Sequence, residues 1–561
     1  MPLGRDASGW FPGSSWRGLL LTAALVAVCL TGLTRSLWTP DEPREAAISR
    51  AMAEHPSFVP TLNGTPFCEK PPLYYWVVAG VFKVTGEFTP EAARAVSAAS
   101  SLLTLLLVFI WARRAFGNET AGLAAVMMGT SLQFLQTSHW ILLDPMLALA
   151  ATAALWAMAE RLRGGGPGWL VLLYGAASAA LFIKGPIGPL LIFLGPCLYL
   201  LVRRKRGEWR RLSLPWGVLA LSCVAALCAW GFYASGGAEA LREFLLLNQI
   251  DRFFHPETTG HARPFHYYFG ALPAAVLPWL APFAALFFPS FWKRLREDAR
   301  PEPFVLASTV AAGFAFLSLS ASKREIYLLP LLPPLFILMG LAAARFAEDW
   351  GEMPTKRKLA LFGILQTLTL VVWTLAAPVG IMAFTKRVSP LAVALLAAGL
   401  TAAVAGGAAC FRRGLKRAFP PFALAALTGA AAMVVLAGPA LNPQKDMTPF
   451  VRWVDVRVPP GPVAAVGADE TLCGIIPFVT GREVLPVGPE EFRRLKEEGH
   501  PPPFIVERVD PDLNPPDLAA NGYELLKEQE FGRKRIFRLW RLKSAGPEPG
   551  ESPAGGLPGD P

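Results

Sequence analysis

Two aspartates stand where a carboxylate could do chemistry at a membrane surface. Asp41 lies in "WTPDEPREAAI", directly after an apolar run, and Asp144 lies in "LLDPMLALA", directly before another. An ionisable group at the bilayer edge is costly to keep there, which favours a functional role, and a carboxylate could orient or deprotonate a hydroxyl. The competing interpretation is helix capping, because Asp–Pro is a good helix start and Thr39 and Glu42 have capping-box spacing.

An acid and a base stand side by side in "FCEKPPLYYW", where Glu69 precedes Lys70. The two prolines restrict the backbone here, and adjacent opposite charges could bind a phosphate and a cation together. An ordinary ion pair in an aromatic belt at the membrane surface explains the same pattern. Lys184, between two apolar runs, carries a weaker functional signal because a lysine side chain can snorkel to the surface.

A histidine-rich loop follows later in the chain. Residues 242–269 contain three of the six histidines, among them His261, and also Arg252. Imidazole is the commonest metal ligand, so His261 and Glu69 could form a loose divalent-metal site for zinc or magnesium. No paired spacing such as HxxxH supports that site, and the seven cysteines show no metal-binding spacing either.

A further basic and aromatic group occurs in "SASKREIYLLPLLPP", where Lys323 and Tyr327 precede an apolar run. A cavity with bases and aromatic side chains at a membrane edge suits a polyprenyl-phosphate donor. Its phosphate would lie on Lys and Arg, and its isoprenoid tail would lie between helices.

Membrane-spanning helices must position these residues. The chain of 561 residues is 53% hydrophobic and only 17% charged, against about a quarter in a soluble domain. Apolar runs of roughly 18–20 residues, enough to cross a bilayer core, recur along it. We therefore predict an all-α polytopic membrane protein with about thirteen spans. The predicted spans cover residues 18–34, 92–112, 119–137, 143–159, 168–183, 185–202, 213–234, 269–289, 302–319, 327–346, 359–384, 389–410 and 418–441.

The orientation follows from Lys and Arg in the short loops. Basic clusters such as 203–211, 293–298 and 412–417 fall at one side of the predicted spans, which is therefore the cytoplasmic side. The loops 35–91 and 235–268 then lie outside. The net charge of +11 is thus mainly a topology signal, and we do not expect nucleic acid as a partner.

The character of the chain changes after the last span. Residues 1–441 form the predicted membrane domain, 442–545 a small external α/β domain, and the Pro/Gly-rich residues 546–561 a disordered tail. Three β-like runs and one helical segment indicate that α/β domain. They cover residues 462–468, 502–509 and 534–542 for the strands and 489–499 for the helix.

The order of these motifs resembles that of membrane glycosyltransferases that use lipid-linked sugars. "DEPREA", "VPTLNGTPFCEKPPLYYW", "LLDP", "KGP" and "SK…Y.LPL.PP" occur in the family's order, and the resemblance covers roughly residues 20–335. The sequence looks most like the branch with the GT-C fold that contains the lipid A aminoarabinose transferases (ArnT-like) and the related protein O-mannosyltransferases. This resemblance implies two surface helices in the loop 35–91 and a periplasmic C-terminal domain.

The resemblance also implies roles for single residues. Asp41 would be the principal catalytic carboxylate, with Asp144 as a second acid that supports it. Glu69 and Lys70 match the pair that, in the aminoarabinose branch, holds a metal and the donor phosphate. The other residues expected to line the donor phosphate and sugar are Arg44, Arg252, Lys323 and Tyr327.

We therefore expect an inverting transfer of a sugar from undecaprenyl phosphate, at the periplasmic face of a bacterial inner membrane, by a monomer. The sugar would be 4-amino-4-deoxy-L-arabinose and the acceptor lipid A or another envelope molecule; a protein acceptor is the alternative. A transporter of lipid-linked substrates would show charge near the bilayer midplane and internal repeats, whereas this sequence gathers charge on one face. The enzyme interpretation requires Asp41, Asp144, Glu69 and Lys70 to converge.

Overall fold

The computed structural model divides into two compact units. The first comprises Met1–Thr34, Pro56–Pro60 and Pro66–Ala440, and the second comprises Arg35–His55, Thr61–Thr65 and Leu441–Pro561. The structure describes residues 16–39, 41–202, 206–251, 254, 262–298, 300–348, 356–387, 389–510, 515–532 and 535–544. The predicted disordered tail, 546–561, lies outside the described residues.

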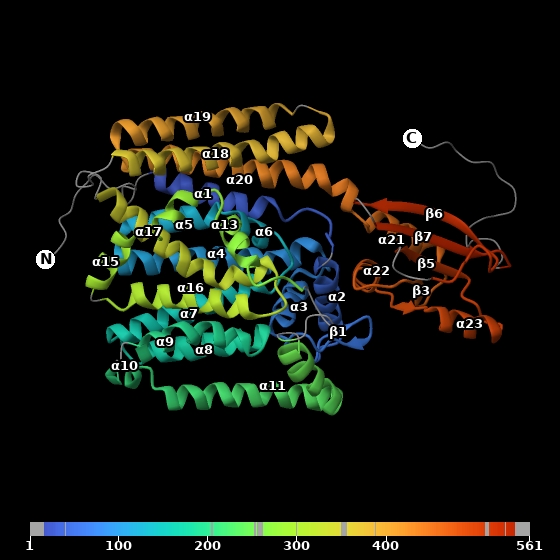
Figure 1. Ribbon diagram of the computed structural model, residues 1–561. Helices are drawn as coiled ribbons and strands as arrows, with labels where there is room; N and C mark the ends of the chain where they lie inside the picture. The colour runs from blue at the N-terminus through green and yellow to red at the C-terminus, as the bar shows by residue number, and fades with distance from the viewer. Residues whose placement is uncertain are drawn as a thin grey trace. The chain divides into compact units, whose positions relative to one another are not determined.

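The first unit is a bundle of helices (Figure 1). Seven helical segments of the described chain are long and apolar enough to cross a membrane, which confirms a polytopic helical membrane protein. Their main helices are α4 (Pro90–Phe116), α11 (Leu214–Arg242), α16 (Glu302–Leu319), α17 (Leu332–Glu348), α18 (Lys356–Thr385), α19 (Pro390–Arg413) and α20 (Leu415–Lys445). The predicted number of about thirteen spans stays a prediction.

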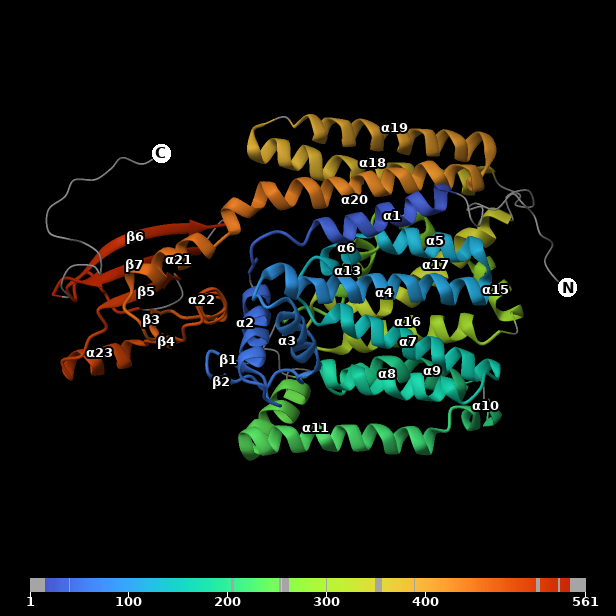
Figure 2. The same ribbon diagram turned by 180° about the vertical axis from the view of Figure 1, so that it is seen from behind.

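Further helices complete this bundle. α7 and α8 form an antiparallel hairpin, and both views show α18 and α19 side by side (Figure 2). These further elements are α1 (Trp16–Thr31), α3 (Leu73–Thr85), α7 (Asp144–Arg163), α8 (Gly168–Lys184), α9 (Ile187–Val202), α10 (Arg206–Arg211), η1 (Glu243–Asp251), α15 (Pro289–Glu297) and η2 (Glu325–Leu331).

Two predicted spans are each broken into two helices. The span at 119–137 is α5 (Asn118–Gly129) and α6 (Leu132–Ser138), and the span at 269–289 is α13 (Tyr267–Ala275) and α14 (Leu280–Ala285). The two breaks satisfy each other: the backbone N–H of Leu132 donates to the carbonyl of Leu277 at 2.9 Å, and Trp279 Nε1 donates to Thr130 Oγ1 at 2.9 Å. Non-helical backbone is tolerated at membrane depth where such partners exist. The continuous spans predicted here were wrong.

Glycines allow close helix crossings in the first unit. A Cβ on Gly195 of α9 would lie 2.4 Å from the backbone of Ser308 in α16, and a Cβ on Gly340 of α17 would lie 2.8 Å from the carbonyl oxygen of Thr120 in α5. Small residues at such crossings let two backbones approach within van der Waals contact. The first crossing holds α16 against α9, and the second holds α17 against α5.

The second unit contains a mixed five-stranded sheet in the order β4-β3-β5-β7-β6. β3 pairs in parallel with β4 and β5, whereas β7 pairs antiparallel with β5 and β6. The strands are β3 (Val463–Val466), β4 (Val484–Pro486), β5 (Phe504–Val509), β6 (Tyr523–Phe531) and β7 (Arg535–Leu542), and the helices are α21 (Thr448–Arg457), α22 (Leu472–Thr480) and α23 (Pro489–Glu497). A small C-terminal α/β domain was predicted and is confirmed; β4, β6, α21 and α22 were not predicted individually.

The predicted helix after Pro40 is α2 (Asp41–Glu54). It belongs to the second unit, together with the C-terminal residues, although the predicted domains assign the loop 35–91 to the membrane domain. A short hairpin of β1 (Thr61–Leu62) and β2 (Thr65–Pro66) follows α2. Its turn residues Asn63 and Gly64 have φ of 54° and 75°, which is the geometry that favours Asn–Gly in two-residue hairpins.

Candidate active site

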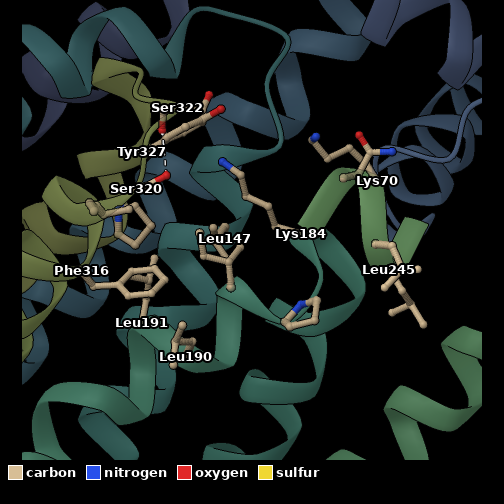
Figure 3. Close-up of a pocket in the computed structure, with 16 residues that line it drawn as sticks. Lys70, Leu147, Lys184, Leu190, Leu191, Leu245, Phe316, Ser320, Ser322 and Tyr327 are labelled. Atoms are coloured by element: carbon tan, nitrogen blue, oxygen red, sulfur yellow. Dashed lines mark hydrogen bonds between the residues drawn. The ribbon is translucent and has the colours of Figure 1, made fainter. Parts of the chain in front are cut away.

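A cavity of about 570 Å³ lies among the helices of the first unit (Figure 3). Most of its wall is aliphatic or aromatic, whereas a few polar side chains gather toward one side of the view. The apolar lining residues include Leu147 of α7, Leu190 and Leu191 of α9, Leu245 of η1 and Phe316 of α16. The polar lining residues are Lys70, Lys184, Asn248, Ser320, Ser322 and Tyr327. An apolar cavity with few polar groups is typical of a ligand site.

The α7–α8 hairpin brings an acid and a base together at this cavity. Asp144 is the first residue of α7 and Lys184 the last of α8, so two helices of similar length that run in opposite directions place both residues at the same end. Lys184 Nζ donates to Asp144 Oδ1, and the two side chains are 11% and 3% exposed. The ammonium also lies 4.6 Å from the ring centre of Tyr327, a cation–π distance.

Lys70 reaches the same cavity from the turn before α3. Its ammonium lies 3.4 Å from Glu69 Oε2, and Figure 3 shows it on the polar side with Lys184. Two lysines at the edge of an apolar cavity would favour a ligand that carries a negative charge. The structure thus brings Lys70, Asp144 and Tyr327, three predicted site residues, to one cavity or its immediate edge.

Ser322 adds an uncommitted hydroxyl to the cavity. Its side chain is 4% exposed, and its Oγ has no hydrogen-bond partner among the described residues. A buried hydroxyl without a partner is costly, so a ligand acceptor at this position would be stabilised. Ser322 was not predicted from the sequence, where a serine next to Lys323 gives no signal.

Lys323 is bound to backbone carbonyls of two loops. It is 3% exposed, and its ammonium donates to the backbone carbonyls of Ser320 and, at 3.1 Å, Arg263. Burial lowers the pKa of Lys323. The residue ties the two loops together and is not one of the described residues that line the cavity; its contact with a donor stays a prediction.

Lys184 is the main residue that the predicted site omits. The sequence singles it out at the junction "IKGPIGP", but snorkelling explains an isolated lysine equally well. The lengths of the runs 143–159 and 168–183 would have indicated a hairpin that returns Lys184 to Asp144. Asn248 and Ser320 carry no comparable signal.

The acidic stretch at the start of α2 lies in the second unit. Glu42 has a structural role: it accepts from the backbone N–H of Trp38 at 2.8 Å and pairs with both terminal nitrogens of Arg35 at 2.6 and 3.0 Å. Asp41 is 3% exposed, and its Oδ1 lies 3.3 Å from Arg44 Nη2. Glu42 thus ties the start of α2 to the segment before it.

Arg44, predicted to bind the donor, is surrounded by carboxylates. Its guanidinium lies 2.7 Å from Glu45 and 2.6 Å from Glu470 in addition to Asp41. Its contact with a donor stays a prediction, as does the convergence of Asp41 with Asp144, Glu69 and Lys70, because these residues belong to different units.

The described part of the chain contains no set of ligands for the predicted metal ion. No group of three His, Cys, Asp or Glu side chains there is arranged to hold a metal ion, and the ammonium of Lys70 beside Glu69 disfavours a divalent cation at that carboxylate. His261 and Arg252 lie outside the described residues. The residues around the cavity are therefore considered without a metal ion.

Part of the chain matches the model of a known protein family. Residues 69–230 match the family model "Dolichyl-phosphate-mannose-protein mannosyltransferase" (PMT_2). The undecaprenyl phosphate-alpha-4-amino-4-deoxy-L-arabinose arabinosyl transferase of Pseudomonas aeruginosa PAO1 is 31% identical over 313 residues, which are 54% of this chain and 55% of that protein. The protein of the same name from Serratia proteamaculans is 30% identical over 374 residues, 64% of this chain and 65% of its own. The chain thus spans little more than half the length of the first relatives that it matches.

Solved structures show the fold over nearly the whole chain. The crystal structure of ArnT from Cupriavidus metallidurans bound to undecaprenyl phosphate superposes with a TM-score of 0.74 at 23% identity, covering 94% of this chain and 99% of that one. The archaeal oligosaccharyltransferase AglB from Archaeoglobus fulgidus, in complex with an inhibitory peptide and a dolichol-phosphate, gives a TM-score of 0.51 at 13% identity, covering 88% and 69%. The predicted fold class and the resemblance to polyprenyl-phosphate-sugar glycosyltransferases are therefore confirmed.

Proposed function

We propose that this protein is an inverting glycosyltransferase that takes a sugar from undecaprenyl phosphate and transfers it to lipid A or another envelope acceptor. One observation carries the proposal: the apolar cavity of the first unit ends at two lysines and at the buried Ser322 hydroxyl, which has no partner among the described residues. A polyprenyl-phosphate donor joins an apolar isoprenoid chain to a phosphate, so both parts of such a donor have a counterpart here. The names of the sequence relatives and the fold support the same substrate class.

The donor phosphate would lie between Lys70 and Lys184, with the Ser322 hydroxyl donating to one of its oxygens. Phosphate leaves the sugar carrying additional negative charge, and fixed positive groups in a low-dielectric site stabilise that charge in the transition state. The isoprenoid would pack on the leucines of α9 and η1. This binding energy would also hold the sugar in one orientation.

Asp144 would act through Lys184. Its carboxylate binds the ammonium and so fixes the direction of the lysine side chain, while the Tyr327 ring covers the ammonium from another side. A lysine held in this way needs little reorganisation when charge develops on the phosphate. We assign Asp144 a positioning role and Lys184 a direct one.

Asp41 would bind the acceptor. For a hydroxyl acceptor its carboxylate would take the proton as the oxygen attacks the anomeric carbon; for a phosphate acceptor it would only orient the group. Attack opposite the departing phosphate inverts the configuration.

The sugar would be 4-amino-4-deoxy-L-arabinose, as in the names of the relatives. A protein acceptor is the second candidate, favoured by the match of residues 69–230 to protein mannosyltransferases. The protein would be a monomer in a bacterial inner membrane. Its active site would be periplasmic, because Arg113, Arg161 and Arg412 end their helices at the opposite side from Asp144. A metal at Glu69 and His261 stays part of the proposal without structural support.

Mass spectrometry of envelope glycolipids from cells with and without the gene tests this function. We expect a fixed mass, that of one aminoarabinose, to disappear from lipid A in the deletion strain and to return with the wild-type gene but not with Asp41→Asn. An unchanged lipid A with a sugar lost from an envelope protein would favour the protein acceptor. No change in either fraction would contradict the proposal.

A further inference from the structure

We propose that Glu470, in the loop between β3 and α22, is a positioning residue that fixes Arg44 and, through it, Asp41. This gives the C-terminal domain a task in the reaction, because it would hold the helix that carries the acceptor-binding carboxylate. The inference rests on the proposed function for the task of Asp41. The contacts that carry it all lie within the second unit.

The C-terminal domain holds α2 along much of its length. Both views show α2 beside α22 (Figures 1 and 2). A Cβ on Gly474 of α22 would lie 2.6 Å from the carbonyl carbon of Pro43 and 2.7 Å from the backbone nitrogen of Arg44. The two helices therefore touch backbone to backbone, at the turn of α2 that contains Asp41.

Two further contacts fix the other end of α2 and the hairpin after it. Arg50 Nη1 donates to the carbonyl of Phe478 at 2.8 Å, in the last turn of α22, where a cation also compensates the helix dipole. Asn63 exchanges two hydrogen bonds with the backbone of Val484, at 2.7 and 2.6 Å. With these attachments, α2 should move with the C-terminal domain rather than independently of it.

Glu470 sets the direction of the Arg44 side chain. Asp41 and Glu45, which also lie at this guanidinium, belong to α2 itself, so they do not fix it relative to any other element. Glu470 Oε2 lies 2.6 Å from Arg44 Nη1 and joins it to the C-terminal domain. The planar guanidinium can then donate to Glu470 on one side and approach Asp41 on the other.

The loop that carries Glu470 is itself held in place. Asp469 Oδ1 accepts from the backbone N–H groups of Thr471 and Leu472, each at 3.0 Å, which caps α22. Asp469 also lies 3.6 Å from Arg508 at the end of β5. Glu470 is therefore presented from a fixed turn at the edge of the sheet.

The Glu470 side chain is 52% exposed, and ion pairs of exposed groups contribute little to stability. Its loss should therefore alter the geometry at Asp41 more than the stability of the fold. This separates a positioning role from a purely structural one, because small displacements of a reacting group strongly reduce the rate.

The test compares Glu470→Gln with Glu528→Gln in the full-length protein in nanodiscs. Glu528 is a matched control: it is 46% exposed and pairs with Arg538 at 2.7 Å in the same domain, but it lies on β6. Transfer from undecaprenyl phosphate-4-amino-4-deoxy-L-arabinose to lipid A is measured at varied donor concentration. Hydrogen exchange of the α2 amides is measured in parallel and needs no activity.

We expect Glu470→Gln to lower kcat about tenfold or more while the donor KM changes less than about threefold, and to speed exchange in α2. Glu470→Asp, which keeps the charge, should recover part of kcat, and Glu528→Gln should match the wild type in both measurements. A kcat within twofold of wild type, or unchanged exchange in α2, would overturn the proposal. If the wild-type protein itself transferred nothing, the proposed function would fail, and exchange in α2 would still decide whether Glu470 holds the helix.

Discussion

Asp144, the first residue of α7, forms an ion pair with Lys184, the last residue of α8, and both side chains are nearly buried. The pair joins the two ends of one helical hairpin. The pair lies beside the apolar cavity, because Lys184 is one of the residues that line it. A buried pair of this kind can contribute to stability and to binding. Substitutions of Lys184 and Asp144 separate the two contributions.

Replacing Lys184 by methionine should abolish most transfer. The change keeps the length of the side chain but removes the charge proposed to face the donor phosphate, and we expect kcat/KM to fall about a hundredfold or more. Transfer assays in nanodiscs provide the measurement. Lys83→Met, which removes an exposed lysine at the end of α3, is the matched control and should leave the rate unchanged; equal losses in both variants would argue against the assigned role.

Replacing Asp144 by asparagine should destabilise the protein because Lys184 would keep a buried charge without its partner. Breaking a buried pair costs about 3–5 kcal/mol. Thermal unfolding in detergent should show a lower midpoint for Asp144→Asn and recovery of most of it in the double variant Asp144→Asn/Lys184→Met. The double variant should nevertheless transfer sugar about a hundredfold more slowly than the wild type, because it lacks the Lys184 charge. A double variant less stable than the single one would contradict this view of the pair.

Two neighbouring acids at the start of α2 should behave differently. Asp41→Asn should reduce transfer by about 10²–10⁴-fold, the range for loss of a general base, while the protein still inserts and expresses. Glu42→Gln should mainly reduce stability, since it weakens the pairing with Arg35 and the hydrogen bond from the backbone N–H of Trp38. Transfer assays and thermal midpoints on both variants test the contrast, and full activity of Asp41→Asn would remove this residue from the mechanism.

Adding a methyl group at Gly474 should separate α22 from α2. A Cβ there would approach backbone atoms of Pro43 and Arg44 within 2.7 Å, and overpacking of this kind costs about 1–3 kcal/mol. Gly474→Ala should therefore lower the thermal midpoint and the transfer rate. Gly488→Ala is the control, because nothing lies within 4 Å of the added Cβ. Equal thermal midpoints and transfer rates in the two variants would show that the contact between α22 and α2 tolerates the extra methyl group.

The thiol of Cys473 should react slowly at neutral pH. Burial, followed by the charges of Asp469 and Glu470, raises the pKa of Cys473 from 9.0 to about 11, so the reactive thiolate is scarce at pH 8. Because the folded state holds this proton more tightly than the unfolded state, the stability of the second unit should fall as pH rises from about 9 to 11.

Labelling of Cys473 with a membrane-impermeant maleimide, followed by mass spectrometry between pH 7 and 11, measures this effect. The rate should rise steeply only above pH 9, and Glu470→Gln should move the rise to lower pH. Rapid labelling at pH 7 would contradict the predicted environment of the thiol.

Local patterns in the sequence were sufficient for several elements. The helix beginning at Asp41 follows from Pro40, Pro43 and the acidic first turn, and α23 follows from its amphipathic pattern, since both depend on residues close in the chain. The long apolar runs likewise predict α4, α16, α18 and α19, because the length of the bilayer core requires them.

Other elements depend on partners far away in the chain. β6, "YELLKEQEF", is rich in helix-forming residues, yet it is a strand because β7 supplies its backbone partners and Arg541 and Arg538 pair with Glu524 and Glu528. The breaks near Thr130 and Leu277 exist because each satisfies the polar groups of the other. Neither arrangement can be inferred from one segment alone.

The sequence by itself determined that this is a polytopic helical membrane protein, and it indicated which residues are chemically suited to a lipid-linked donor. Only the tertiary structure decided that Lys184 belongs with Asp144, that Glu42 pairs with Arg35, and that Glu470 lies against Arg44. The reason is physical: hydrophobic length and capping act over a few residues. The pairing of two side chains, by contrast, depends on how separate helices pack.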